Sequence, residues 1–144
     1  MTKTTLPKLQ TKSEKQWYLI DAKGQTLGHL ATKVVDLLRG KNKVIFTHHV
    51  DVGAYVVVIN MSEIHVTGKK ELDKDYFHHT RYPNGLHREV LGDLRKTNPA
   101  KILQDAVSGM LPRNRSRRFV MERLKIYAGE QHEHIAQKPE SVTL

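Results

Sequence analysis

The sequence of 144 residues contains no cysteine. A chain without cysteine forms no disulfide, supplies no thiolate to a zinc ion and has no cysteine nucleophile. The apolar run around Tyr55 to Ile59 is far shorter than the ~20 residues of a membrane-spanning helix. The amino terminus also lacks the apolar stretch of a secretory signal. We therefore expect a soluble protein without a membrane partner.

Aromatic and acidic residues are scarce. Aromatics make up 6% of the chain, and no pair has the spacing of a base-stacking platform on adjacent strands. Aspartate and glutamate number 15 against 24 lysines and arginines, so the formal net charge is +9 and the isoelectric point about 9.8. This imbalance favours a polyanionic partner. Recognition of a folded RNA through its backbone and shape is the interpretation that fits both observations.

The first half of the chain predicts strands that alternate with a helix. "WYLI" at residues 17–20 is typical of a strand, and the nearly continuous apolar run at 54–60 indicates a strand covered on both faces. Between them, apolar residues recur with helical spacing from Leu27 to Leu38. Thr26 is a candidate cap of this helix and Gly40 a candidate stop. Weaker strand signals follow Ile64 and surround Tyr76 and Phe77.

The second half predicts a turn, two helices and a last strand. "RYPNGLH" at 81–87 has turn chemistry, and Asn98 and Pro99 are suited to begin a helix that ends near Pro112. This helix has a predicted buried stripe of Ile102, Leu103, Ala106, Val107 and Met110. Val120, Met121 and Leu124 indicate another short helix, and "KIYAG" a final strand. The alternation predicts a single α/β domain over 17–144, preceded by a flexible basic arm over 1–16.

The most unusual stretch is "GMLPRNRSRRF" at 109–119. Six basic residues and one acidic residue lie between Arg113 and Lys125, and cations this crowded repel one another unless an anion neutralises them. An exposed cationic helix is the simpler explanation of this stretch. It does not explain two further basic clusters, "RGKNK" at 39–43 and the arm. A phosphate backbone accounts for all three. Arginine suits this partner because its planar guanidinium binds phosphate through two hydrogen bonds.

"VSGMLPRNRSRRFVMERLKIYAG" (107–129) resembles the signature region of the family of ribosomal protein thirteen of the large subunit, in its bacterial form. "WYLIDAKGQTLGHLAT", "LLRGKNKVIFTHHVDVGAYVVVIN", "VTGKK" and "HIAQKPE" are similar too, in the family's order. The resemblance covers about residues 17–140. It implies a three-layer α/β/α fold around a small, mainly parallel sheet of about four strands. It also implies a non-catalytic constituent of the large subunit that binds its 23S-type RNA beside neighbouring ribosomal proteins and supports early assembly, in cytoplasmic or organellar ribosomes.

The resemblance also identifies candidate RNA-binding residues. The family's basic positions correspond to Arg39, Lys41, Lys43, Lys69, Lys70, Arg113, Arg115, Arg118 and Lys125. The charge pattern adds Arg81, Arg117 and Arg123.

The sequence departs from the family at several of its positions. Arg117, Arg81 and Asn84 stand where the family usually has glycine, so the local turns are expected to differ. His29 and His78 stand where it usually has arginine, which lowers the charge at those positions near neutral pH.

Nine histidines raise the alternative of a metal-dependent hydrolase. The pairs at 48–49 and 78–79, with His132 and His134, are potential imidazole ligands, but adjacent residues of a strand point to opposite faces and H-E-x-x-H is absent. "YLIDAKGQTLG" lacks a dinucleotide fingerprint, so we expect no cofactor and no small-molecule substrate. A DNA-binding module is a further alternative, but no helix with a basic reading face emerges.

Overall fold

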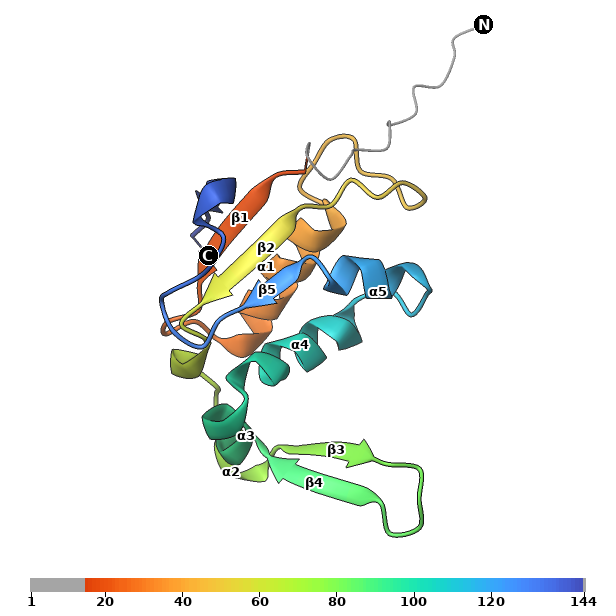
Figure 1. The fold of residues 1–144 in the computed structure, drawn as a ribbon, viewed down its shortest axis with the longest axis vertical. Helices are drawn as coiled ribbons and strands as arrows, with labels where there is room; N and C mark the ends of the chain where they lie inside the picture. Colours follow the sequence, from red (N-terminus) through yellow and green to blue (C-terminus); the bar gives the residue numbers. More distant parts are fainter. Residues whose placement is uncertain (1–14, 144) are drawn as a thin grey trace, which may run out of the picture.

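The computed structural model describes residues 15–143, so most of the arm predicted for 1–16 lies outside the described residues. Four parallel strands form the central sheet in the order β5-β2-β1-β6 (Figure 1). They are β1 (Trp17–Asp21), β2 (Tyr55–Ile59), β5 (Leu124–Ile126) and β6 (Glu140–Ser141). The predicted α/β class and the small parallel sheet are therefore confirmed.

Helix α1 (Leu27–Arg39) covers one face of this sheet. Its apolar residues have helical spacing, and they form the core together with Val56 and Val58 of β2 and with helix α4. The helix begins after Thr26, as predicted, although the Thr26 side chain makes no capping hydrogen bond. It ends at Gly40, whose φ of 74° is the left-handed conformation that glycine adopts without steric cost.

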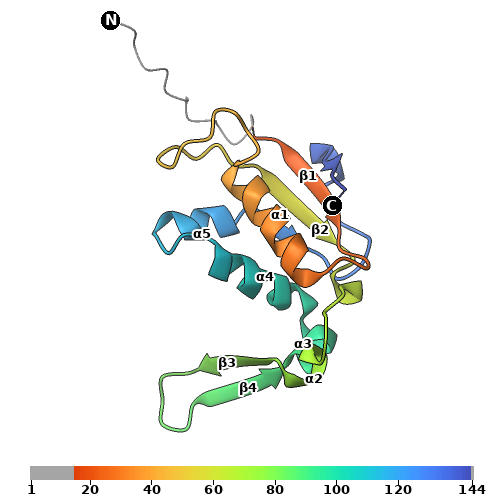
Figure 2. The same cartoon turned by 180° about the vertical axis from the view of Figure 1, so that it is seen from behind.

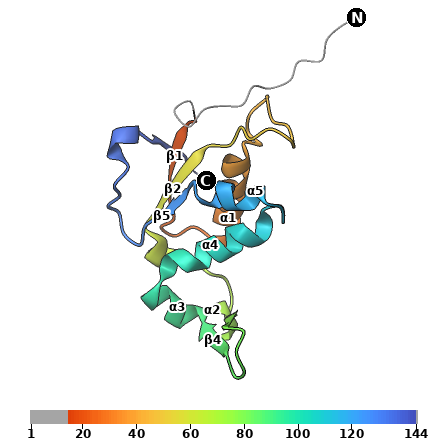
Figure 3. The same cartoon turned by 45° about the vertical axis from the view of Figure 1, so that its right-hand side comes forward.

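The opposite face of the sheet is covered by the segment that follows β5. Trp17 and Tyr55 stack on this face with ring centroids 4.3 Å apart, and the His134 ring lies 5.0 Å from that of Trp17. The segment contains one 3-10 helix, η2 (Ile135–Gln137), on the far side of the sheet from α1 (Figure 3). This cover explains the unbroken apolar run of β2, because Val57 is also fully buried.

The middle of the chain forms a projecting hairpin and the helices that support it (Figure 2). In order they are η1 (Met61–Glu63), α2 (Lys70–Asp73), β3 (Asp75–His79), β4 (Leu86–Val90), α3 (Leu91–Thr97) and α4 (Pro99–Met110). Strands β3 and β4 pair with each other and not with the central sheet. The hairpin ends at the predicted turn, where Arg81 and Asn84 have φ values of 67° and 59°. Within residues 15–143 no helix is both long and apolar enough to cross a membrane.

Four expectations about individual elements were wrong. Ile64 begins no strand, since only an isolated bridge joins Thr26 to His65. Met110 is 46% exposed because it lies at the last turn of α4 and does not face the core. Leu124 belongs to β5, since the preceding helix ends at Met121. The "KIYAG" strand is not the last, because β6 follows it in the chain. Strand β6 pairs with β1 through the backbone and has no apolar pattern.

Candidate nucleic-acid interface

The arginine block follows a sharp turn at the end of α4. Leu111 is buried and extended, with ψ of 150°, as expected for a residue before proline. After Pro112 a short loop leads into α5 (Ser116–Met121). The Arg117 backbone N–H donates to Asn114 Oδ1 at 3.1 Å, which closes this loop. The block is therefore held between a buried leucine and a helical turn.

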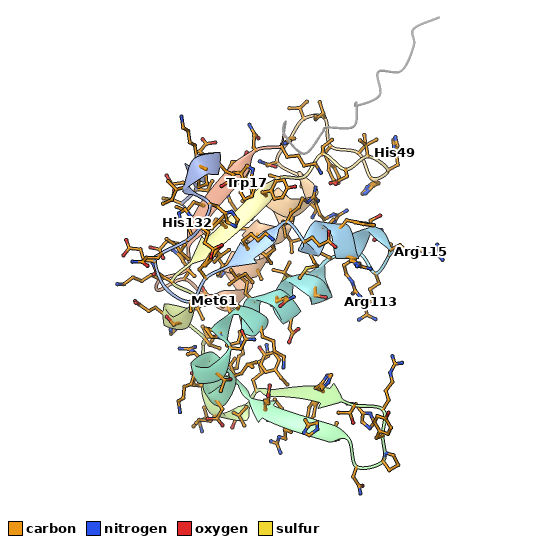
Figure 4. The ribbon with its side chains drawn as sticks, in the orientation of Figure 1. Trp17, His49, Met61, Arg113, Arg115 and His132 are labelled. Carbon is orange, nitrogen blue, oxygen red and sulfur yellow. The ribbon has the colours of Figure 1, made fainter. Side chains whose placement is uncertain are left out.

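The arginines of the block differ in exposure. Arg113, Arg115 and Arg118 are exposed, and Figure 4 shows the first two pointing away from the protein. Arg117 is half-buried, and its Nη1 donates to the Ser108 carbonyl oxygen at 3.4 Å. Arg118 Nε lies 3.6 Å from Glu122 Oε1, a solvent-exposed pair that contributes little to stability. Three guanidinium groups are thus open to an external anion, and Arg117 connects the loop to α4.

Arg123 does not belong to this exposed set, although the charge pattern predicted that it contacts RNA. Its side chain is 5% exposed, and Nη1 donates to both carboxylate oxygens of Asp51, at 2.9 and 2.7 Å. Nη2 donates to the Leu38 carbonyl oxygen near the end of α1, at 3.0 Å. Buried arginine requires such partners because an unpaired charge in the protein interior is costly. We therefore assign Arg123 a structural role.

Asp51 connects several segments through this contact. Lys15 Nζ also donates to Asp51 Oδ2 at 2.7 Å, so this residue of the predicted arm is attached to the domain. Burial alone would raise the pKa of Asp51, but the hydrogen bonds and charges of Lys15 and Arg123 outweigh burial and lower it. The ionised carboxylate thus joins the segments before β1, after α1 and after α5. Charge pattern alone did not identify Asp51, although it is the only acidic residue between Asp36 and Glu63.

The basic cluster at 39–43 lies at the start of the loop between α1 and β2. Arg39 lies over the Phe46 ring, 5.7 Å from its centroid, and Lys41 pairs with Asp36 at 3.2 Å. The pKa of Lys43 is lowered, mainly by burial and then by the nearby charges of Lys15 and Arg123. This loop and the arginine block project on the same side of the molecule (Figures 1 and 4). A pocket of about 300 Å³ between them is lined by both segments.

The remaining candidates are not gathered at this surface. Lys69 and Lys70 lie where α2 begins, at the opposite end of the molecule from the loop after α1. Lys125 pairs in register with Val57 and so lies on the sheet face opposite α1. Arg81 is exposed at the tip of the hairpin, which projects on the same side as the arginine block but is separated from it (Figure 1). The structure thus unites the clusters at 39–43 and 113–118.

Comparisons with known proteins show to which family the chain belongs. Residues 15–133 match the family described as Ribosomal protein L13. The chain belongs to the ribosomal protein L13 family. The "Large ribosomal subunit protein uL13" of Staphylococcus aureus strain JH9 is 47% identical over 135 residues, which are 94% of this chain and 93% of that protein. The proteins of the same description from strains Newman and USA300 are similar to the same extent.

The three residues that the resemblance places at usual glycine positions have a structural explanation. Arg81 and Asn84 adopt the left-handed backbone at the hairpin turn, so both positions keep the conformation that glycine favours. Arg117 lies inside α5 instead, where φ is not positive. The arginine is therefore accommodated by helical geometry and contributes its side chain to the contact with α4.

The histidines of this L13 chain do not converge. Within residues 15–143, no group of three or more histidine, aspartate or glutamate side chains is placed to hold one metal ion. His48 and His49 lie in the loop after α1, whereas His132 and His134 lie beside Tyr127 near the central sheet. This geometry does not supply the three ligands that the hydrolase alternative requires.

Proposed function

We propose that this protein is a structural, non-catalytic constituent of the large ribosomal subunit that binds the large-subunit RNA. One observation carries the proposal. Arg113, Arg115 and Arg118 are exposed together between the end of α4 and the first turns of α5, beside the basic loop after α1. Glu122 is the only acidic residue between Arg113 and Lys125, so their charge is largely uncompensated. Membership of the L13 family supports the same conclusion.

The interface binds phosphates and does not read a base sequence through a recognition helix. Each exposed guanidinium can donate two parallel hydrogen bonds to a phosphate. Arg117 and Arg123 hold the surface in place: the first connects the turn to α4, and the second fixes the chain after α5 to Asp51. Because these contacts already hold the backbone of this surface, less of the chain needs to become ordered when an RNA of matching shape binds.

Further contacts extend this interface. We include Arg39, Lys41 and Lys43 in the same surface, and Arg81, Lys69, Lys70 and Lys125 as separate points at which a surrounding RNA reaches the protein. Residues 1–16 add a basic segment that the assembled subunit protects from protease. Contacts with neighbouring ribosomal proteins and a location in cytoplasmic ribosomes are part of the same proposed role.

The salt dependence of RNA binding tests the proposal. Each neutralised phosphate contributes ~0.7–0.9 to the slope of log affinity against log salt. The variant R115A/R118A should therefore bind purified large-subunit RNA with a slope that is smaller by up to about 1.4–1.8. K23A/K96A is the matched control, because both lysines are exposed and the variant loses the same formal charge. Equal slopes for the arginine variant and the parent protein would refute the phosphate contacts.

A further inference from the structure

Phe119 is a large apolar side chain that the fold leaves in solvent. It lies in α5 and is 64% exposed, whereas Val120 and Met121 of the same helix pack against the core. This apolar ring is next to Arg118 in the sequence and lies within the basic surface. A ring held in this position is available to a ligand.

The surface is hollowed on both sides of Phe119. On one side, the pocket of about 300 Å³ also includes Arg39, Phe46 and His48 in its wall. The rings of Phe46 and His48 meet edge to face with centroids 5.4 Å apart, so aromatic surface faces this pocket from both the loop and the helix. On the other side, a hollow of about 500 Å³ is lined by Arg115, Arg118 and neighbouring residues of the block.

The two hollows suit the two parts of a nucleotide. The aromatic pocket is at the lower end of the ~300–1,000 Å³ range of small-molecule sites, which is enough for a planar base. Unpaired bases in RNA commonly stack on aromatic rings and on guanidinium planes, and this pocket has both. The arginine-lined hollow offers charge for the adjoining phosphates. A protein neighbour fits less well, because it would desolvate Arg115 and Arg118 without supplying a polyanion.

We propose that an unpaired nucleobase of the large-subunit RNA enters the pocket between α5 and the loop after α1 and stacks on Phe119, while its phosphates follow Arg115 and Arg118. This inference rests on the proposed RNA-binding function and specifies one contact of it. Tertiary structure creates the site, since Phe46 and Phe119 come from segments far apart in the sequence. RNA binding therefore includes base stacking in addition to phosphate neutralisation.

Substitution of the ring tests the stacking contact on purified, protein-free large-subunit RNA. F119L keeps an apolar side chain but removes the ring, and stacking on one aromatic ring contributes at least about a fivefold change in affinity. We expect F119L to weaken binding by that factor without changing the salt slope, and F119W to restore it. F77L is the matched control, because Phe77 is also 64% exposed and lies on the hairpin. It should bind as the parent protein does.

Several results would overturn the inference. If F119L binds protein-free RNA as tightly as the parent protein does, stacking is excluded. If F119L is lost only from subunits that are assembled with other proteins, Phe119 contacts a protein neighbour instead. A smaller salt slope in F119L would show that displaced arginines, and not the ring, cause the loss. Equal weakening by F77L would show a general effect of removing exposed rings. If the parent protein does not bind the RNA at all, the proposed function and this inference fail together.

Discussion

Arg123 Nη1 lies 2.7 Å from Asp51 Oδ2, although 72 residues separate the two in the chain. The contact joins the segment after α5 to the loop that precedes β2. A third segment meets them there, because Arg123 Nη2 donates to the Leu38 carbonyl oxygen. The segments that carry the two basic clusters of the proposed interface are therefore joined by one ion pair. We expect its removal to lower the free energy of unfolding.

Asp51→Asn should destabilise the protein. The amide keeps the shape of the side chain but leaves the Arg123 guanidinium, 5% exposed, without its counter-charge. The Asp51 side chain is itself 45% exposed, so the loss is smaller than for a fully buried pair, and we expect the free energy of unfolding to fall by about 1.5–3 kcal/mol. Urea denaturation measures this change. Asp93→Asn is the control, since its pair with Lys96 is 3.8 Å long and Asp93 is 76% exposed, and it should cost less than about 1 kcal/mol. Equal losses would contradict the structural role of Asp51.

Acid should reduce the difference between the parent protein and Asp51→Asn. The folded pKa of Asp51 is lower than its ordinary value of 3.8, so the charged group stabilises the fold fully above that pH. As pH falls below 3.8 and through the folded pKa, this stabilisation is lost. Urea denaturation at several pH values between neutrality and ~3 would show the two free energies of unfolding converging. A constant difference over that range would mean that ionisation of Asp51 is irrelevant.

Gly53→Ala should be destabilising for a steric reason. A Cβ at this position would lie 1.8 Å from the Leu38 carbonyl oxygen, the atom that also accepts from Arg123. Overpacking of this kind costs about 1–3 kcal/mol. Gly109→Ala in α4 is the matched substitution, because its added Cβ meets nothing within 4 Å apart from its chain neighbours and the backbone of its own helix. It should stabilise the helix by about 0.5–1 kcal/mol. Thermal melts would separate the two effects, and a neutral Gly53→Ala would show that the backbone yields easily.

Trp17 and Tyr55, which stack on the sheet face opposite α1, should be energetically coupled. Trp17 and Tyr55 have ring centroids 4.3 Å apart and an interplanar angle of 7°. In a double-mutant cycle with W17L and Y55L, we expect a coupling of about 0.5–1.5 kcal/mol beyond the loss of buried area. Unfolding should be followed by circular dichroism, since Trp17 is the only tryptophan. Additive losses would mean that the rings stabilise the sheet independently.

The spacing of apolar residues was enough to predict α1 and the greater part of α4, because apolar residues repeat there with the period of a helix. Strand β2 was predicted from its nearly continuous apolar run, which is typical of a strand covered on both faces. Met110 and Leu124 were misplaced because helix ends depend on the packing of the next segment. Strand β6 was missed because an edge strand can be held by backbone hydrogen bonds alone, which leave no apolar pattern.

Composition and apolar periodicity by themselves determined that this chain is basic and α/β, because charge and periodicity are properties of the residues, and its motifs indicated the ribosomal protein family through their resemblance to it. Only the tertiary structure decided which arginines face outward. Arg115 and Arg123 are equivalent in a count of charge, but one is exposed and the other is buried against Asp51. The physical reason is that burial depends on partners distant in the chain, and the same folding brings Phe46 and Phe119 to one pocket.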